Sequence, residues 1–486
     1  MRIAVTGRTS ERSVALATLR ARSKLELAVG AIAVAYILIF LGSAIARATY
    51  PFPLDPIEPG ALQQVRRVLA GQPLYVEPKL DYVPFIYGPV YFYLAALFGP
   101  TFAGLRLVSI LASCASMLLL ARLVERETHS WLLGLVSAAV LAAANPLVHG
   151  ALDLGRMDAL ALALMLAAIF VARVGTTARA ALAAGVLVAL AILTKQTAAP
   201  LALALVVALL PGRPRHAVLL AATTCIVVAA VFGALTLQSG RWPLFYFWEL
   251  PRQHVISVDL LDRFWDDLLA RATVPLLVAA AFLLVRRNVF YALATAAMLG
   301  SAWVARANSG GAPNVDLPAF AMLALLFGLG LPVFFRHHAY IYGLAAAQLL
   351  LMLSNPRQLV PYRADVWAGE RLSAGLQALP GPVFAPSFGG YIESSGADPG
   401  ALGELMGAYG GRLTPEGQQW LQAYGAALAA RQYARVVVDP DWPAFFIPDV
   451  ARDQHYTLVG PLFPSGDEFW SWRGSRTPRA DVYAPP

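Results

Sequence analysis

The chain has 486 residues, of which 58% are hydrophobic and only 14% are charged, and its mean hydropathy is +0.61. Soluble domains carry roughly 25% charged residues, so these values exclude a soluble globular protein and predict one that crosses a membrane several times. The net charge of +8 does not indicate nucleic-acid binding, because the basic residues are scattered between apolar stretches and do not line one polar face.

The first 26 residues are predicted to be a basic cytoplasmic tail. Residues 1–24 are rich in arginine and contain one acid, Glu11, and an apolar stretch at 27–45 follows with about the 20 residues that a span needs. Ala44-Ile45-Ala46 is similar to a signal-peptidase site, but the long basic region and the span-length apolar stretch favour an uncleaved helix. With or without cleavage, residue 50 lies outside the cytoplasm.

Further apolar stretches continue to residue 353 and give about eleven crossings in all. They occupy residues 102–121, 131–148, 157–173, 180–193, 197–210, 216–237, 273–285, 289–305, 318–335 and 339–353. Every second connection then contains arginine: Arg122, Arg126, Arg173, Arg179, Arg213, Arg215, Arg286, Arg287 and Arg336. This alternation is typical of the positive-inside rule and predicts these connections to be cytoplasmic.

The topology depends most on residues 180–210, where Thr194-Lys195-Gln196-Thr197 interrupts one apolar run. A single long helix there would invert every later element. Two short crossings keep the basic connections on one side, so we favour that interpretation. The opposite, extracytoplasmic face then receives residues 47–101, 149–156, 238–272 and 306–317, the tip at Lys195 and the C-terminal region.

The first external loop, residues 47–101, is predicted to carry the chemistry. Between positions 50 and 93 it is too polar to span a membrane, and Pro59 and Gly71 suit the start and the stop of a short interfacial helix. Residues 89–98 are too short for a crossing and are expected at the same surface.

Residues 354–486 are less hydrophobic and predict a small extracytoplasmic α/β domain after a transmembrane domain at 27–353. Stretches 383–385 and 436–438 are typical of buried strands. Residues 414–432 predict a helix, with Thr414 as N-cap and Pro415 at the first helical position.

Two acids in the first external loop, Asp55 and Glu58, are candidate catalytic bases. A positioned carboxylate that accepts the proton of a reacting hydroxyl accelerates a reaction by about 10²- to 10⁴-fold. Glu58 would lie at a helix N-terminus, which favours its charged form and makes Glu58 the slightly preferred base, with Asp55 close behind. Two acids in a loop are also common solvated residues, so the spacing alone leaves both interpretations open.

Cations near the same face are candidates for binding a phosphate. They are Arg106, Arg156, Lys195 and Lys79. Arg106 and Arg156 are equally explained by snorkelling, or by a local ion pair of Arg156 with Asp158. Lys195 is harder to explain structurally, because a lysine at the bilayer centre costs about 2.5 to 3.5 kcal/mol.

Other polar positions are less informative. Gly310, Gly311 and Asn314 suit close approach of a ligand to the backbone, although the same residues also form an ordinary turn. His254 and four aspartates at 259–267 show no metal-ligand spacing and are expected to form a solvated face. Cys114 and Cys225 lie inside apolar segments and predict neither a disulfide framework nor a metal site.

Several motifs, taken in order, resemble the polytopic GT-C glycosyltransferases that use polyprenyl-phosphate sugars, in particular protein O-mannosyltransferases and aminoarabinose transferases. The motifs are Asp55-Pro-Ile-Glu58-Pro-Gly60, Gly71-Gln-Pro-Leu-Tyr75, Tyr87-Gly-Pro-Val-Tyr91, Arg106-Leu-Val-Ser109, Gly155-Arg156-Met-Asp158-Ala159, Leu193-Thr-Lys195-Gln196, Gly310-Gly311 to Asn314 with Pro318, and Arg476-Thr-Pro-Arg-Ala-Asp-Val-Tyr483. They cover most of residues 50–200 and some later islands.

The resemblance implies an integral membrane enzyme of a bacterial-type inner membrane that acts in glycan or cell-envelope biosynthesis. It implies transfer from a polyprenyl-phosphate sugar to a glycan, lipid or protein acceptor, with inversion and with Asp55 or Glu58 as the base. Lys195 or Arg156 would face the donor phosphate, with Arg106 and Lys79 as further phosphate ligands. Substrate contacts are expected from Tyr87, Tyr91, Asp158, Gly310, Gly311 and Asn314. Many relatives have adjacent acids where this chain separates them, so a divalent metal stays an open possibility and no cofactor is expected with certainty.

Two other functions are consistent with the composition. A lipid-carrier transporter or flippase without transferase activity would show internal repeats and charges at the centre of spans, and the sequence has no such repeat. A scaffold whose C-terminal domain binds a partner would depend on residues 354–486 and not on the loop acids.

Overall fold

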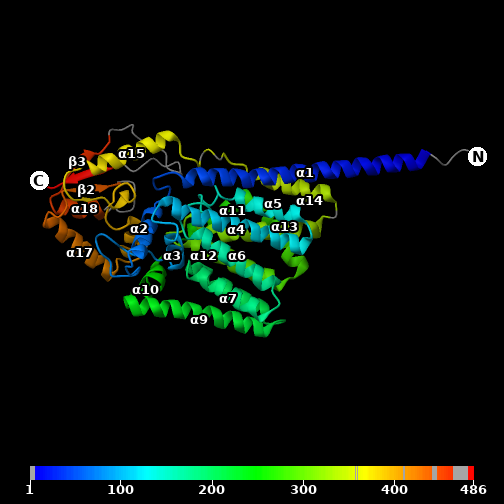
Figure 1. Ribbon diagram of the computed structural model, residues 1–486, viewed down its shortest axis with the longest axis horizontal. Coiled ribbons are helices and arrows are strands. Elements are labelled where there is room, and N and C mark those ends of the chain that lie inside the picture. Colours follow the sequence, from blue (N-terminus) through cyan, green and yellow to red (C-terminus); the bar gives the residue numbers. More distant parts are fainter. Residues whose placement is uncertain are drawn as a thin grey trace, which may run out of the picture.

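The computed structural model describes residues 6–335, 337–355, 357, 359–393, 395–408, 411–439, 446–463 and 480–486. Figure 1 shows a bundle of long helices with the C-terminal α/β region at one end, next to α2 and α3. The N-terminal part of α1 projects beyond the other end of the bundle. Arg336 and residues 476–479, the first half of the motif at 476–483, lie outside the described residues.

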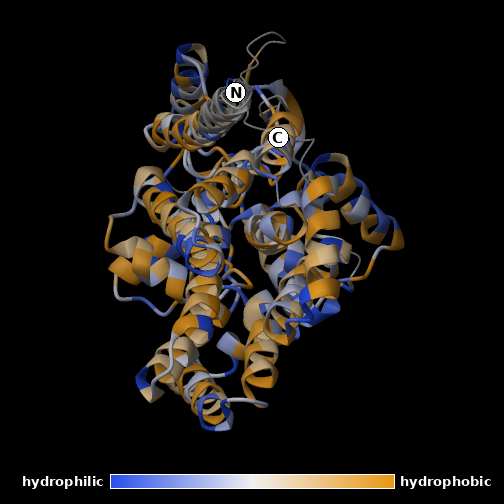
Figure 2. Ribbon diagram, turned by 90° about the vertical axis from the view of Figure 1, so that its right-hand side faces the viewer, coloured by the Kyte–Doolittle hydropathy of each residue, from blue (hydrophilic) through white to orange (hydrophobic). Residues whose placement is uncertain are grey.

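Each of the predicted apolar stretches contains a helix. The helices are α1 (Thr6–Ala48), α4 (Phe102–Thr128), α5 (Trp131–Ala143), α6 (Asp158–Val174), α7 (Ala178–Ile192), α8 (Ala199–Leu209), α9 (Pro214–Ser239), α11 (Val258–Arg286), α12 (Val289–Ala307), α13 (Leu317–Phe334) and α14 (His338–Leu351). Among the described residues, six helices are long and apolar enough to cross a membrane, and shorter apolar helices accompany them. Apolar residues dominate the helices in Figure 2. The predicted helical membrane fold is confirmed, whereas the number of crossings stays a prediction.

The interruption at residues 194–197 separates two helices, as expected. Helix α7 ends at Ile192 and α8 begins at Ala199, with a 3₁₀ turn at Gln196–Ala198 between them. Lys195 is extended, with φ −149° and ψ 120°. The chain therefore leaves the helical conformation at Lys195, the lysine that lies between two apolar segments.

The structure differs most from the prediction at residues 238–272, which were expected to form a loop. After α10 (Trp242–Leu244), a π-helical turn at Phe245–Glu249 and a 3₁₀ turn at Pro251–Gln253, helix α11 already begins at Val258. Asp259, Asp262, Asp266 and Asp267 are exposed on its first half, so charge did not prevent helix formation there. A kink at Ala272 (φ −125°), three residues before Pro275, separates this polar half from the apolar half.

The first external loop contains the predicted short helix and a second one, α3, that the sequence did not predict. Helix α2 (Glu58–Leu69) buries Leu62 and Val65, and it is followed by Gly71 with φ +64°, a conformation that favours glycine. Helix α3 (Val90–Ala96) has only seven residues. The rest of residues 70–89 forms irregular chain and turns, which is consistent with its proline content.

The C-terminal region has a four-stranded sheet in the order β1-β2-β4-β3. Strands β1 (Val383–Phe384) and β2 (Arg435–Val438) are parallel, β2 and β4 (Asp481–Ala484) are antiparallel, and β3 (Thr457–Pro461) pairs antiparallel with β4. Helix α17 (Pro415–Ala429) connects the region of β1 to β2 and begins at Thr414, which accepts a hydrogen bond from the Gly417 backbone. The sequence did not predict α15 (Arg363–Gln377), α16 (Pro399–Leu405), α18 (Phe446–Asp453), β3 or β4.

The C-terminal region shares its core with the first external loop. One buried cluster joins Leu62, Tyr75 and Phe92 to Phe384 and Trp420. A second cluster joins residues 50–54 to α15, and the rings of Phe52 and Tyr391 stack with centroids 5.0 Å apart. The two segments, about 300 residues apart in sequence, therefore fold as one packed unit at the end of the bundle.

Candidate functional site

Glu58 and Arg106 form a fully buried ion pair. The Arg106 Nε and Nη2 atoms donate to the two carboxylate oxygens of Glu58 at 2.9 and 2.6 Å, and both side chains are completely buried. The backbone N–H groups of Leu54 and Gly155 also donate to this carboxylate, each at 2.8 Å. Burial alone would raise the pKa of Glu58, but Arg106 and these donors lower it below its usual value.

Arg106 also organises the backbone around it. Its Nη1 and Nη2 atoms donate to the carbonyl oxygens of Arg47, Tyr50 and Phe52 at 2.9, 2.5 and 2.6 Å. All of its donors are therefore directed at the chain that leaves α1 and leads to the acidic motif. This arrangement holds the start of the first external loop against α4.

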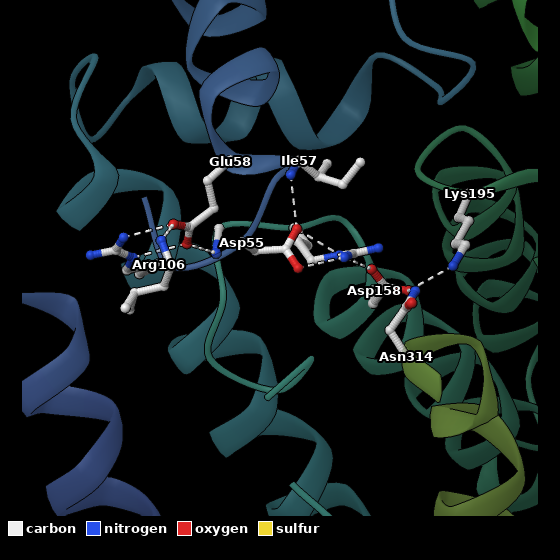
Figure 3. Close-up of polar contacts among 10 residues, drawn as sticks. Asp55, Ile57, Glu58, Arg106, Asp158, Lys195 and Asn314 are labelled. Carbon is white, nitrogen blue, oxygen red and sulfur yellow. Dashed lines mark hydrogen bonds and ion pairs between the residues drawn. The ribbon is translucent and has the colours of Figure 1, made fainter. Parts of the chain in front are cut away.

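Asp55 is held by a different arginine. Arg156, in the connection before α6, donates through Nη1 to Asp55 Oδ1 and Oδ2 at 2.9 and 3.0 Å. The Ile57 backbone N–H donates to Oδ1 at 2.9 Å. Figure 3 shows Asp55 between the Glu58–Arg106 pair and a second cluster around Asp158.

Asp158, the first residue of α6, joins residues from three further segments. Its Oδ1 accepts from Lys195 Nζ at 2.6 Å and from Asn314 Nδ2 at 2.9 Å, and its Oδ2 accepts from Arg156 Nε at 3.2 Å. The four side chains of Asp55, Arg156, Asp158 and Lys195 thus form a chain of alternating charge. Figure 3 shows Asp158 next to Lys195 and Asn314. The sequence anticipated the local ion pair of Arg156 with Asp158, but only the fold brings Asp55 and Lys195 into contact with them.

A cavity of about 420 Å³ adjoins this cluster. Predicted site residues on its wall are Asp55, Tyr87, Arg156, Lys195, Gly310, Gly311 and Asn314. A smaller adjoining pocket is lined by Asp158, Lys195 and Asn314. Seven of the predicted residues, from four distant segments, therefore face one space of a size that suits a small ligand.

Other predicted residues are not on the wall of this cavity. Glu58 and Arg106 are buried against each other, and Tyr91 is buried and donates to the Leu105 carbonyl at 3.0 Å. Lys79 is exposed, and its carbonyl accepts from the Trp420 indole N–H at 2.9 Å, which ties the loop to α17.

The sequence did not single out His254 and Glu404 as site residues. Both line the cavity and contact each other, His254 through Nε2 and Glu404 through Oε2. Partial burial of His254 would lower its pKa, but Glu404 raises it above the usual value. The expectation that His254 belongs to a solvated face was therefore wrong, and no sequence signal links two residues 150 positions apart.

The geometry of the described residues does not support a metal-binding site. Within the described ranges, no three or more His, Cys, Asp or Glu side chains are grouped so that they could hold a metal ion. The acids of the site are instead satisfied by Arg106, Arg156 and Lys195.

Comparison with known proteins identifies the fold. Residues 84–240 match the model of a family described as dolichyl-phosphate-mannose-protein mannosyltransferase. The structure is similar to two crystal structures of ArnT from Cupriavidus metallidurans, one bound to undecaprenyl phosphate (TM-score 0.57, 13% identity) and one in the apo state (TM-score 0.58, 14% identity). Each match covers 93% of this chain and 98% of that chain. The chain has a GT-C glycosyltransferase fold.

The resemblance of the motifs to GT-C glycosyltransferases is thereby confirmed. The family match begins at residue 84, so it contains Arg106, Arg156, Asp158 and Lys195 but not the acidic motif. The structure is also similar to the archaeal oligosaccharyltransferase AglB from Archaeoglobus fulgidus in complex with an inhibitory peptide and a dolichol-phosphate (TM-score 0.49, 12% identity, 96% of this chain and 74% of that chain). No curated protein matches the sequence.

Proposed function

We propose that this GT-C chain transfers a sugar from a polyprenyl-phosphate donor to an acceptor on the extracytoplasmic side of a bacterial-type inner membrane. The observation that carries the proposal is the cavity itself, because one wall of it combines a carboxylate, Asp55, with two cations, Arg156 and Lys195. A base for the acceptor and a binding site for the departing phosphate are the two groups that this reaction requires. The match to a family of dolichyl-phosphate-mannose users and the likeness to an ArnT bound to undecaprenyl phosphate support the same donor class.

Asp55 is our candidate for the general base. It faces the cavity, whereas Glu58 is enclosed by Arg106 and two backbone N–H groups. The lowered pKa of Glu58 also makes it a poor proton acceptor. Its role in the proposal is to hold the loop that presents Asp55.

Lys195 and Arg156 are our candidates for binding the donor phosphate. Lys195 contacts Asp158 at 2.6 Å, and both cations line the cavity. Their charges are balanced by Asp55 and Asp158, so a bound phosphate would compete with these acids for the same N–H donors. Asp158 and Asn314 would orient the Lys195 ammonium toward the phosphate.

The proposed reaction is a single displacement with inversion. The acceptor hydroxyl oxygen forms a bond to the anomeric carbon while its proton passes to Asp55. The bond from that carbon to the phosphate oxygen breaks, and its electron pair leaves with the polyprenyl phosphate, which Lys195 and Arg156 stabilise. Every proton and charge in this step is assigned to a residue of the cavity.

The N-terminus of α1 is proposed to lie in the cytoplasm and the α/β region outside. The basic connections after α4, α6, α8 and α11 support this orientation by the positive-inside rule. In this orientation, the cavity opens toward the extracytoplasmic leaflet.

The Asp55→Asn variant tests the proposed base. Reconstituted protein would be supplied with a panel of polyprenyl-phosphate sugars and a membrane extract as acceptor, and sugar transfer would be measured alongside undecaprenyl phosphate binding. We expect transfer to fall by about 10²- to 10⁴-fold with binding changed far less. Asp259→Asn is the matched control, because Asp259 is exposed on α11. Full transfer by Asp55→Asn would exclude Asp55 as the base.

A further inference from the structure

A second cavity, of about 530 Å³, lies at the opposite end of the bundle. It is formed where α4, α11 and α13 end and α12 begins. Its lining residues are Glu127, Thr128, Phe282, Arg286, Asn288, Tyr291, Leu329, Pro332 and Val333. None of them belongs to the cavity around Asp55, so this is a separate site.

Arg286 provides the positive charge of this cavity. Its side chain is exposed and has no hydrogen bond or ion pair with any residue that the structure describes. Arg287 follows in the left-handed conformation (φ 48°), which ends α11 and turns the chain sharply into α12. Asn288, on the wall of the same cavity, caps α12 by accepting from the Tyr291 N–H at 3.3 Å, which leaves its amide NH₂ group as a donor.

The acid in the cavity does not cancel this charge. Glu127 is paired with Arg173, whose Nε lies 2.7 Å from Oε1. The Tyr291 hydroxyl also donates to Oε1 at 3.2 Å. Because Glu127 is neutralised within the protein, the cavity keeps one net positive charge and two groups that can donate to an anion.

Part of the remaining wall is apolar and lies beside exposed apolar side chains of α11. Phe282, Leu329 and Val333 line the cavity. Leu284 and Val285, which immediately precede Arg286, are 75% and 61% exposed, as expected of side chains in contact with lipid tails. A free phosphate ion would use the arginine but would leave the apolar walls without a partner.

We propose that this cavity binds the phosphate group of an anionic phospholipid from the adjacent leaflet. Arg286 and the Asn288 amide donate to the phosphate, and an acyl chain packs along Phe282, Leu329 and Val333. Basic pockets between transmembrane helices bind lipid head groups by this combination of charge and apolar contact. The inference does not depend on the glycosyltransferase activity, although the proposed orientation makes this the cytoplasmic leaflet.

Binding of phosphatidylglycerol and phosphatidylcholine to the full-length protein in mild detergent, measured by native mass spectrometry, tests this site. We expect wild type to retain phosphatidylglycerol in preference to phosphatidylcholine, and Arg286→Gln to weaken phosphatidylglycerol binding by about fivefold. Val333→Trp, which fills the cavity and leaves the cation unchanged, should weaken it as well. Arg215→Gln, an exposed arginine on α9, is the matched control and should have no effect.

Three results would overturn the proposal. Equal retention of the two lipids would show that binding does not depend on the negative charge of the lipid. An equal loss in Arg286→Gln and Arg215→Gln would attribute binding to diffuse surface charge. Complete displacement of the lipid by millimolar inorganic phosphate would identify the site as one for free phosphate.

Discussion

At the scale of single residues, the two acids of the loop motif have separate environments despite their proximity in sequence. Asp55 faces the cavity, and Glu58 is sealed against Arg106. The motif resemblance identified the pair as important but could not separate their roles, because burial is a property of the folded chain. The helix-terminus argument that favoured Glu58 as base explains its charged state equally well as a structural ion pair.

Glu58→Gln is expected to lower the stability of the folded protein. A direct effect on substrate contacts is not expected, because Glu58 does not line the cavity. Removing one partner leaves Arg106 buried without its counter-charge, which costs roughly 3–5 kcal/mol in the free energy of unfolding. The unfolding midpoint of the purified protein in detergent should fall clearly. Arg122→Gln disrupts an exposed pair with Glu125 and should change it little. An unchanged midpoint for Glu58→Gln would contradict a structural role.

The lowered pKa of Glu58 also predicts a pH dependence. An acid whose pKa is lower in the folded state stabilises the fold fully above its unfolded pKa of about 4.3. This contribution is lost as the pH falls through the lowered folded pKa. The difference in unfolding midpoint between wild type and Glu58→Gln should therefore shrink on strong acidification.

At the scale of elements, Lys195 is positioned by the break between α7 and α8 and by the loop that packs on it. The Val90 backbone N–H donates to the Leu193 carbonyl at 3.2 Å, and a Cβ at Gly88 would lie 1.9 Å from that oxygen. Glycine is needed at position 88 because two backbones approach each other there. Apolar periodicity predicted both helices, but it carried no information on what packs against their junction.

Gly88→Ala is expected to displace the α7–α8 junction and with it Lys195. A shift of about 1 Å at a positioned group can lower the rate by roughly 10²-fold, so transfer should fall and undecaprenyl phosphate should bind more weakly. Gly42→Ala in α1 is the control, since a Cβ there meets no atom within 4 Å. Wild-type binding and transfer by Gly88→Ala would show that the contact does not position Lys195.

At the scale of the whole molecule, the C-terminal region completes the cavity. Gly400 and Glu404 of α16 line it together with residues of the bundle, and Asp398 packs against Gly60 of α2. Burial raises the pKa of Asp398 to about 7. A scaffold with an independent C-terminal domain would not require this shared wall, so the described contacts support one functional unit.

The contact of His254 with Glu404 predicts that docking of α16 depends on pH. The pKa of His254 is raised in the folded state, so the contact stabilises docking fully below the unfolded pKa of about 6.5. This contribution is lost as the pH rises through the folded pKa. Hydrogen exchange in α16, corrected for intrinsic rates, should therefore increase above neutral pH in wild type.

Glu404→Gln provides the matched control for that measurement. It keeps the shape of the side chain but removes the charge that stabilises protonated His254. Exchange in α16 should then be faster at acidic pH and nearly independent of His254 titration. A wild-type pH profile in this variant would exclude the pair as the source of the effect.

The sequence by itself determined the membrane helices, helix α2 of the first loop, and two strands and a helix of the C-terminal region. These elements depend on local composition, periodicity and capping, which are properties of residues close together in the sequence. The charged residues at 259–267 led to the prediction of a loop where α11 begins. An exposed face of a helix tolerates such charges, so they did not mark a loop.

Only the tertiary structure decided which polar residues meet. The contacts of Asp55 with Arg156, of Asp158 with Lys195 and Asn314, and of His254 with Glu404 join segments separated by 101, 37, 156 and 150 positions. The physical reason is that buried charges require partners, and the packing of helices and the shared core determines which partners are within reach.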